Sequence, residues 1–456
     1  MSDTTMELRQ GVELGFLSWA RIKFIAALAL PILATMLTQN LMQVIDTAMI
    51  GQLGDSALAG VSLAGNQFFT LFSLLVGISA SVQMMVARRM GEGNVGQTPL
   101  ILNTGLILGV SIGIGLLLPG YFLLPWVINT FSPDAAVAAQ ANRYLFTIMP
   151  TTVIAGCAVA YSGYWIGLSK PLIGFFVLVV QVLCNATFNY ALIFGHFGLP
   201  AMGIAGAGLG TTLANLVGVI IHTVLAIIHA GKAGFLRKLP EKQQVQTLIK
   251  IALPMNLQQF LFTLGITIFV FIVGALGTKA LAAFQVNIVI MMTLFMMIMG
   301  LGSTATTLVS GSLGKREPDN AEQWAWEIST LGAGILMVLG VFFFIYAEDL
   351  LHLFIADSET VVLALIPLRI MIASFWIEGY GRVLAMALVG AGAIGSVFKI
   401  NFINQWFVRL PLYWLIGIKL GYGLIGIFIT MAVMYVVQTL LFINVWRNGH
   451  WREIRV

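Results

Sequence analysis

Few ionisable side chains fall inside the long apolar runs of this 456-residue chain. Asp46 lies in the first such run. Glu378 and Arg382 lie in the tenth, and Arg409 lies in the eleventh. A charged side chain at the centre of a membrane helix costs about 2.5–3.5 kcal/mol on the insertion scale. Each of these groups therefore needs a function or a compensating partner.

Asp46 is the leading candidate for proton chemistry, because no cation lies within a helical turn of it. Gln39 and Gln43 precede it by seven and three residues, which places all three on one helical face. A lone carboxyl among amides in a low-dielectric setting holds its proton more readily than one in water, so we expect Asp46 to exchange H⁺ near neutral pH. The alternative is a helix-end aspartate wetted at the outer surface, since Gly51 follows five residues later.

Amide side chains repeat along one face of the fifth apolar run, at Gln181, Asn185 and Asn189. Amides in membrane helices often serve only to join helices through hydrogen bonds. Threonine and asparagine side chains of the sixth run can instead complete a polar pocket with the first run. The residues expected in this pocket of the N-terminal half are Gln39, Gln43, Asn185, Asn189, Thr211 and Asn215.

The polar groups of the second half have different chemistry. Glu378 and Arg382 are spaced i, i+4, which predicts an intrahelical ion pair that neutralises both. A cation or proton site built on Glu378, with Arg382 keeping it ionised, is the alternative. Asn401, Gln405 and Arg409 form a further polar stripe on the eleventh run.

The composition requires that membrane helices position these residues. Hydrophobic residues make up 59% of the chain and charged residues 9%, whereas about 25% of a soluble domain is charged. Runs long enough to cross the hydrocarbon as helices recur six times in each half. They are expected at about 24–50, 58–86, 99–128, 136–166, 171–195, 203–230, 247–273, 281–310, 325–347, 359–389, 396–418 and 424–446.

The sequence consists of two tandem copies of one membrane unit. The offset in numbering that carries Leu30-Pro31 onto Leu253-Pro254 also carries Gly167 onto Gly390, without a gap. Such duplication is typical of secondary transporters. We predict an all-α integral membrane protein with 12 transmembrane helices in two pseudo-symmetric six-helix bundles. The expected parts are an N-terminal lobe at 1–230, a cytoplasmic linker at 231–246 and a C-terminal lobe at 247–456.

Basic residues concentrate in the loops on one side of the membrane, which the positive-inside rule assigns to the cytoplasm. Both termini fall on that side, and the net charge of +5 is therefore not a nucleic-acid signal. The residues on this side are Arg9, Arg21, Lys23, Arg88, Arg89, Lys170, Lys232, Arg237, Lys238, Lys242, Lys315, Arg316, Arg447, Arg452 and Arg455.

No enzyme constellation is visible in the sequence. It has no Gly-rich phosphate loop with a lysine, so we expect no ATP hydrolysis. The five histidines show no metal-ligand spacing, and we expect neither a metal nor a cofactor. Pro31, fifteen residues before Asp46, removes a backbone hydrogen bond from its helix. It is either a hinge for the segment that carries Asp46 or a static kink.

The run from Gln43 to Gly54, QVIDTAMIGQLG, and the run from Gly203 to Ala207, GIAGA, resemble the multidrug and toxic compound extrusion (MATE) family. The resemblance extends over about residues 20–445. It implies an antiporter that expels cationic, amphipathic drugs and dyes against inward flow of H⁺ or Na⁺. It also implies a V-shaped bundle that alternates between outward- and inward-facing states.

Individual residues also match the family pattern. The family's coupling-ion aspartate of the first helix matches Asp46, and the bend of that helix maps to Pro31. A fifth-helix polar pair, Asn then Asp in the DinF-like branch, matches Asn185 and Asn189, and the second amide resembles the NorM-type branch. The tenth-helix acid of Na⁺-coupled NorM members matches Glu378. Their seventh-helix glutamate falls instead on Phe262.

The sequence therefore predicts a monomeric, proton-coupled antiporter of cationic amphipathic drugs in a bacterial inner membrane. Protonation of Asp46 would bias the first helix between two shapes and release the drug outward. Na⁺ coupling through Asp46 or Glu378 is the alternative. A lipid-precursor flippase is a further possibility that would prefer a strongly cationic central cavity. A non-transporting membrane scaffold has no need for a repeat with polar interior stripes.

Overall fold

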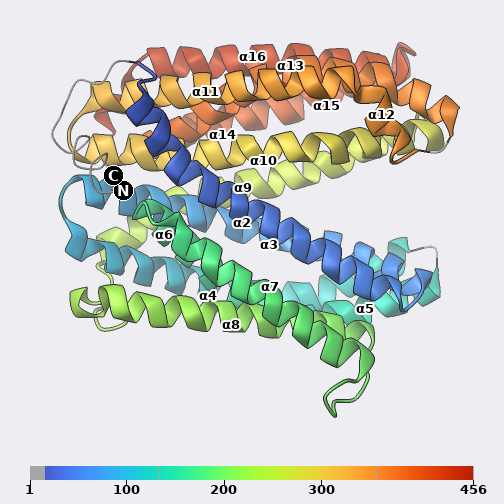
Figure 1. Ribbon diagram of the computed structural model, residues 1–456, viewed down its shortest axis with the longest axis horizontal. Coiled ribbons are helices and arrows are strands. Elements are labelled where there is room, and N and C mark those ends of the chain that lie inside the picture. Colours follow the sequence, from blue (N-terminus) through green and yellow to red (C-terminus); the bar gives the residue numbers. More distant parts are fainter. Residues whose placement is uncertain (1–15, 133, 356, 455–456) are drawn as a thin grey trace. The chain divides into compact units, whose positions relative to one another are not determined.

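The computed structural model describes residues 16–132, 134–355 and 357–454. No strand occurs in this part of the chain, and ten of its helices are long and apolar enough to cross a membrane (Figure 1). These ten are α2 (Trp19–Gly51), α3 (Asp55–Gly91), α4 (Thr98–Phe131), α7 (Pro171–Phe194), α8 (Ile204–Ala230), α9 (Lys242–Gly274), α10 (Thr278–Gly314), α11 (Pro318–Ile345), α13 (Ser358–Ala391) and α16 (Gly423–Arg447).

Two further spans are interrupted helices. The fourth span is a pair, α5 (Ala135–Ile148) and α6 (Thr151–Gly167), bent by 54° where Pro150 withholds a backbone N–H. The eleventh follows without a break from 394 to 419 but contains π-helical turns on both sides of Pro411. Its parts are α14 (Ile394–Ile403), η3 (Asn404–Arg409), α15 (Leu410–Trp414) and η4 (Leu415–Lys419). The prediction of an all-α membrane protein with twelve spans is thereby confirmed.

Contacts divide the chain into two compact units. Unit 2 comprises Ala34–Phe260, and unit 1 comprises the described residues up to Leu33 together with those from Leu261 onward. The division falls inside α2 and α9, whereas the sequence repeats divide at the linker expected at 231–246. Each unit therefore contains the first half of the leading helix of the other repeat.

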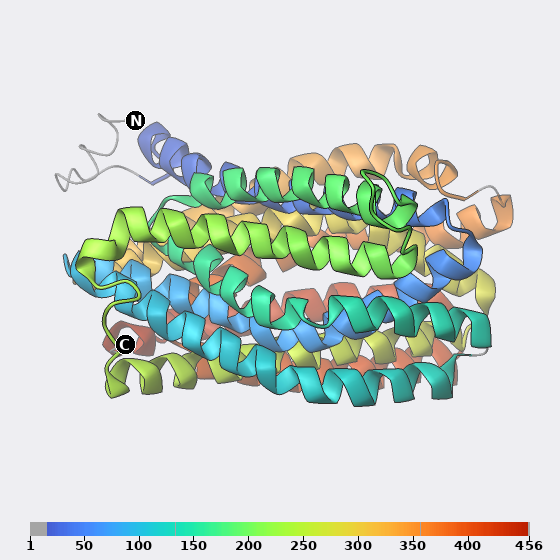
Figure 2. The same ribbon diagram turned by 90° about the horizontal axis from the view of Figure 1, so that it is seen from below.

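The helices of unit 2 pack around α3, which contacts α4, α5 and α6. Helix α7 lies along α8, and α8 also packs on α5 and α6 (Figure 2). Helices α3 and α6 approach closely at glycines of α6: a Cβ atom on Gly163 would overlap the carbonyl oxygen of Ser79, and one on Gly167 would lie 2.7 Å from that of Gln83.

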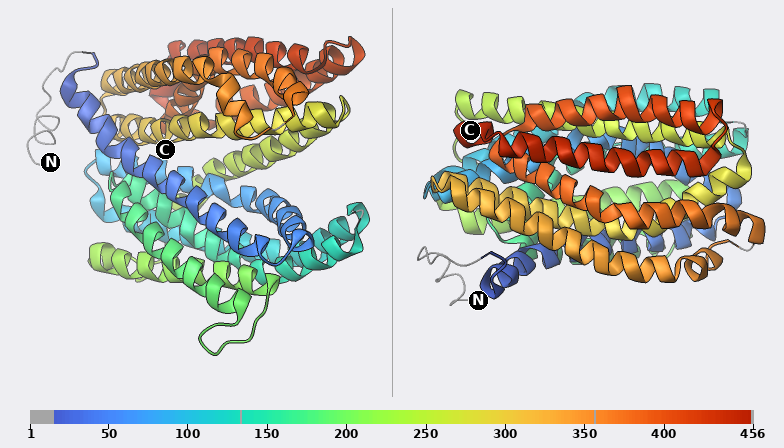
Figure 3. Two further views of the ribbon diagram at one scale, coloured as in Figure 1. Left: turned by 45° about the vertical axis from the view of Figure 1, so that its right-hand side comes forward. Right: turned by 90° about the horizontal axis from the view of Figure 1, so that it is seen from above.

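The helices of unit 1 pack around α13, which corresponds to the α5–α6 pair at the offset that relates the two repeats. This helix contacts α10, α11 and α16, and it runs beside α16 in Figures 1 and 3. A Cβ atom on Gly390 would lie 2.6 Å from the carbonyl oxygen of Thr306. Gly390 and Thr306 are the partners of Gly167 and Gln83 at the offset that relates the two repeats. The duplication therefore extends to individual backbone contacts.

The exchanged helix halves also obey this offset. In unit 2, a Cβ atom on Gly77 of α3 would lie 2.6 Å from the backbone nitrogen of Asn256 of α9. In unit 1, a Cβ atom on Gly300 of α10 would lie 2.8 Å from Cδ2 of Leu33 of α2. Residues 33 and 256 are repeat partners, as are 77 and 300, so each leading helix begins in one unit and ends in the other.

The segment expected as the linker is anchored to unit 2. The buried Asn103 side chain donates from Nδ2 to the carbonyl oxygens of Gly234 and Lys238, at 3.3 and 3.0 Å. Its Oδ1 atom accepts from the backbone N–H of Leu236 at 3.1 Å. After η2 (Gly231–Ala233), the chain leads from this anchor into α9, which begins at Lys242.

The two ends of the described chain meet at one end of unit 1, on the first turns of α11. Arg21 of α2 pairs with the fully buried Glu327 and stacks 3.4 Å above the ring of Trp324. Arg452 of η5 (His450–Glu453) pairs with Asp319 at 3.1 Å. That both termini face the cytoplasm stays a prediction, and Arg9 and Arg455, on which it partly rests, lie outside the described residues.

Replacing Gly390 by Ala should destabilise unit 1 by about 1–3 kcal/mol, because the added methyl group meets backbone that cannot rotate away. Gly395→Ala is the matched control, since nothing lies within 4 Å of its Cβ position. Thermal unfolding of the purified variants in detergent measures the difference. Equal unfolding temperatures for the two variants would contradict the tight contact with Thr306.

Candidate functional site

Helix α2 carries Asp46 into unit 2, one turn before its anchored end. Ile50 has only 3% of its surface exposed and belongs to a core cluster with Ile193 of α7 and Ile204 of α8. This anchoring places the half-buried Asp46 against α7. The Nδ2 atom of Asn189, which is itself 1% exposed, donates to Asp46 Oδ1 at 2.7 Å.

A hydrogen-bonded chain extends from Asp46 into the unit. Asn189 also donates to Asn185 Oδ1 at 3.4 Å, and Asn185 donates to Thr211 Oγ1 of α8 at 3.3 Å. Asn215 donates to the carbonyl oxygen of Thr211 at 2.8 Å and accepts from Gln181 Nε2 at 3.0 Å. The amide stripe predicted on the fifth helix and the polar residues of the sixth thus face one another.

One hydrogen-bond acceptor of this polar network, on Asn189, has no donor in the described part of the chain. The Oδ1 atom of Asn189 is buried and has no hydrogen-bond partner among the described residues. It lies against Gly210 of α8, where a Cβ atom would overlap it. Gly210 therefore makes room for the Asn189 amide, which can offer Asp46 either its N–H₂ group or its oxygen.

Gln39 and Gln43 are not brought into this network. Both side chains are exposed, and neither forms a side-chain hydrogen bond within the described part of the chain. The reason is helical geometry: Gln39 lies about 10 Å from Asp46 along the axis, and Gln43 is rotated about 60° from it. Placement on one face of α2 was therefore not sufficient to bring Gln39 and Gln43 into the pocket of Asp46.

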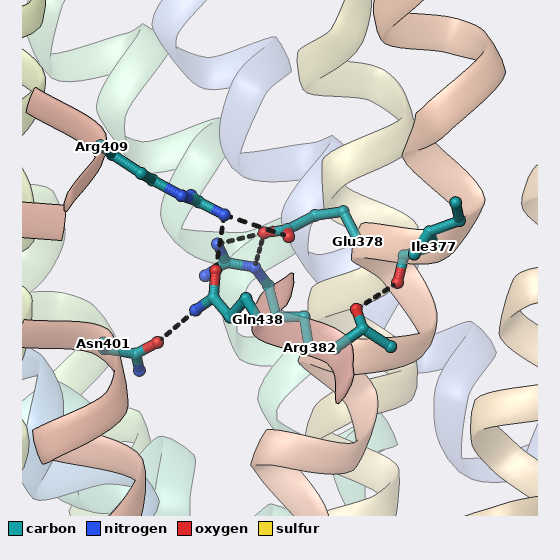
Figure 4. Close-up of polar contacts among 7 residues, drawn as sticks. Ile377, Glu378, Arg382, Asn401, Arg409 and Gln438 are labelled. Atoms are coloured by element: carbon teal, nitrogen blue, oxygen red, sulfur yellow. Dashed lines mark hydrogen bonds and ion pairs between the residues drawn. The ribbon is translucent and has the colours of Figure 1, made fainter. Parts of the chain in front are cut away.

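A second polar cluster lies in unit 1, where α13, the eleventh span and α16 meet (Figure 4). Arg382 donates from Nε and Nη2 to Glu378 Oε1 at 3.0 and 2.5 Å, which is the i, i+4 ion pair of α13. Arg409 approaches the other carboxylate oxygen from η3 at 3.9 Å. Glu378 is therefore held by two guanidinium groups.

Gln438 of α16, which was not predicted as a site residue, joins this cluster to the eleventh span. It accepts from Arg409 Nη2 at 2.6 Å and donates to Asn401 Oδ1 at 2.6 Å (Figure 4). A glutamine inside the apolar run at 424–446 was the available signal. Gln405 points elsewhere and donates to the carbonyl oxygen of Phe262 at 3.1 Å.

Pro31 is buried inside α2, which continues through it as an unbroken helix. It lies two residues before Leu33, the last residue of α2 that belongs to unit 1. The segment that follows carries Asp46 in unit 2. Pro31 thus marks the point at which the leading helix passes from one unit to the other.

The family assignment rests on two matches along the chain. The MatE family profile matches residues 31–191 and 254–415, which together exceed half of the sequence. This chain belongs to the MATE family. The two matches begin at Pro31 and Pro254, which are partners in the internal repeat. MATE proteins are transporters, so the chain is a membrane transporter and not an enzyme.

Known MATE proteins resemble this chain over nearly its whole length. A probable multidrug resistance protein NorM from Bradyrhizobium diazoefficiens is 28% identical, with 89% of each chain covered. A protein of the same name from Thermotoga maritima is 26% identical and covers 94% of this chain and 93% of its own. The Vibrio cholerae MATE transporter VcmN in the bent form has a similar fold, with a TM-score of 0.84 and 20% identity. That match covers 94% of this chain and 98% of VcmN.

The sequence departs from the Na⁺-coupled MATE pattern at Phe262, and the structure shows what lies beside this residue. The ring of Phe262, at the position of their seventh-helix glutamate, lies 5.7 Å from the guanidinium carbon of Arg382. In this MATE chain an aromatic ring thus faces a cation at a position where the resemblance would place an acid. Glu378 is consequently the one carboxylate with an ion pair to Arg382 or Arg409 among the described residues.

Proposed function

We propose that this MATE transporter exports cationic, amphipathic drugs from the bacterial cytoplasm in exchange for inward-moving H⁺, with Asp46 as the group that carries the proton. The contact between Asp46 and Asn189 is the observation that supports the proposal. We also propose a multi-pass protein of the inner membrane with both termini in the cytoplasm. It acts as a monomer and needs no cofactor other than the coupling ion.

The Asn189 amide suits a carboxyl group that changes its protonation state. When Asp46 is ionised, the amide N–H₂ group donates to it at 2.7 Å. When Asp46 is protonated, its O–H group needs an acceptor, and Asn189 Oδ1 is buried and unused. A rotation of the amide therefore exchanges one hydrogen bond for another. The same contact can persist in two arrangements of the end of α2.

The position of Asp46 in unit 2 also favours its role as the proton-carrying group. The other described acids of unit 2 lie at or next to helix ends, where water can reach them: Asp55, Glu92, Asp134 and Glu241. Asp46 is the one described acid of unit 2 inside an apolar span. Its ionised form attracts a cationic drug, and its protonation removes that attraction. H⁺ and drug then compete through one charge, which gives the differential affinity that exchange requires.

Glu378 is less suited to carry a coupling cation. Its carboxylate already faces Arg382 and Arg409, so a Na⁺ ion would have to displace a guanidinium group. Na⁺ coupling at Asp46 remains the alternative, because amide and hydroxyl oxygens lie close to that carboxylate. The choice between the two ions rests on a transport measurement.

The test uses the purified chain in proteoliposomes loaded with an ethidium-like dye. We expect an imposed pH gradient alone to drive dye movement, and an imposed Na⁺ gradient at equal pH to have no effect. Liposomes without protein give the passive leak. Dye movement that follows only the Na⁺ gradient would overturn H⁺ coupling, and no movement under either gradient would overturn drug export.

A further inference from the structure

The linker between α8 and α9 is held in one compact conformation by Asn103. This buried side chain binds the backbone N–H of Leu236 and the carbonyl oxygens of Gly234 and Lys238. Leu236 is kept in the left-handed region, at a φ of 56°, which a leucine rarely adopts. Such strain persists only where the surrounding structure enforces it, and it gathers at functional sites. The linker is therefore a fixed surface loop and not a slack tether.

The loop folds back alongside the spans instead of projecting beyond their ends. Asn103 is five residues, or about 7.5 Å, past the start of α4 at Thr98. The buried Phe235 packs edge-on against Tyr161 of α6, with ring centroids 6.4 Å apart. Helix α4 has 34 residues and is about 51 Å long, so roughly 10 Å at each end extends beyond a hydrocarbon core of about 30 Å. The loop therefore lies at the level where headgroups meet acyl chains.

The outer surface of this loop combines apolar side chains with unpaired cations. Leu236 and Leu239 are 60% and 87% exposed. Arg237 and Lys238 lie between them, are also exposed, and form no ion pair with any described residue. Residues 231–246 contain four basic residues and one acidic residue. Leucines exposed to this degree are unfavourable in water but suit the acyl-chain boundary, and the cations suit anionic headgroups.

We propose that the linker loop, residues 234–239, is a docking site for anionic phospholipid of the leaflet on its side of the membrane. Arg237 and Lys238 bind the lipid phosphate, and the two exposed leucines enter the acyl-chain boundary beside it. Basic segments next to membrane helices attract anionic lipids in this way. The depth of the loop favours lipid over a partner protein, since lipid already surrounds this level of the helices. The inference goes beyond the proposed export function and does not depend on it.

The test measures binding of dioctanoylphosphatidylglycerol to the full chain in neutral detergent at low ionic strength, by microscale thermophoresis. Each Lys or Arg near a headgroup contributes about fivefold in affinity. The double variant Arg237→Gln with Lys238→Gln should therefore weaken binding about thirtyfold. Leu239→Gln, which removes an apolar contact and no charge, should weaken binding at least about fivefold. An affinity of the double variant equal to that of the wild type would overturn the proposal.

Lys315 and Arg316 are a matched control pair, because they are adjacent, exposed and basic, and they follow α10 outside the loop. Replacing both by Gln removes the same charge and should leave the affinity near its wild-type value. An equal fall in the two double variants would show attraction to net charge alone and would overturn the site. Displacement of the lipid by glycerol phosphate at equal concentration would do the same, because the loop would then bind small anions.

A second copy of this chain is the competing occupant. Loss of self-association in Leu239→Gln without a change in lipid affinity would assign the loop to that contact and overturn lipid docking.

Asn103 is a positioning residue in this proposal, and cleavage by trypsin after Arg237 and Lys238 tests its role. Phosphatidylglycerol should protect these two bonds in the wild-type chain. Asn103→Ala keeps every cation but releases the loop, so its bonds should be cut faster and should gain little protection from the lipid. Equal protection of the variant and the wild type would show that Asn103 does not position the loop.

Discussion

Replacing Asp46 by Asn should abolish dye transport driven by a pH gradient. The amide keeps the shape of the side chain and can still accept from Asn189 Nδ2, but it can neither bind H⁺ nor attract a cation. Coupling between two ligands is typically about 1–3 kcal/mol, or roughly 5–150-fold in affinity. We therefore expect a loss of driven transport of at least about tenfold. The measurement is dye movement in proteoliposomes with an imposed pH gradient.

Asp55→Asn is the matched control for this experiment, because Asp55 is an exposed acid of the same unit at the first turn of α3. It should transport like the wild type. Unfolding temperatures close to that of the wild type for both variants would show that the fold is intact. Normal dye and H⁺ exchange by Asp46→Asn would remove Asp46 from the coupling scheme.

Replacing Glu378 by Gln should strongly destabilise unit 1. The cluster would then hold two guanidinium groups and no carboxylate, and its net charge would rise from +1 to +2. Loss of one partner from a buried ion pair costs about 3–5 kcal/mol. The partial exposure of Arg382 places our expectation at the lower end of that range. Thermal unfolding in detergent measures the effect.

A double variant tests whether the excess positive charge causes the expected loss of stability. The double variant Glu378→Gln with Arg382→Gln returns the cluster to +1, so it should regain much of the lost stability. Glu359→Gln is a control, because Glu359 pairs with Lys279 at an exposed position where an ion pair contributes little. If the single variant at Glu378 were as stable as the wild type, the cluster would not depend on its carboxylate.

Much of the fold could be predicted from the sequence, because a helix that crosses the lipid bilayer needs a long apolar run. Apolar length fixes where spans occur, and the constant offset between the repeats fixes their grouping. The bend at Pro150 and the π-helical turns beside Pro411 were not predicted. Length and hydropathy do not record how a helix accommodates a proline. The exchange of helix halves was also invisible, because it depends on contacts between residues far apart in the chain.

The candidate site was predicted less completely. The spacing of Asn185 and Asn189 placed them on one face, and the structure brings that face to Asp46 and Thr211. Gln39 and Gln43 were expected beside Asp46 because they were placed on the same face of its helix, but their neighbours on other helices also decide whether they line a pocket. Gln438 was missed for the same reason, since a lone amide in an apolar run does not reveal its partners.

The crossing of α2 and α9 from one unit to the other has a consequence for biosynthesis. Unit 2, the first unit that could finish folding, lacks the first half of α9 until residue 260 has left the ribosome. The opening stretch of α2 must wait longer, because α10 and α11 are made only in the second half of the chain. Translation can insert the helices one after another, but neither repeat can complete its packing alone, and the opening stretch of α2 lacks its partners in unit 1 until α10 and α11 have been made.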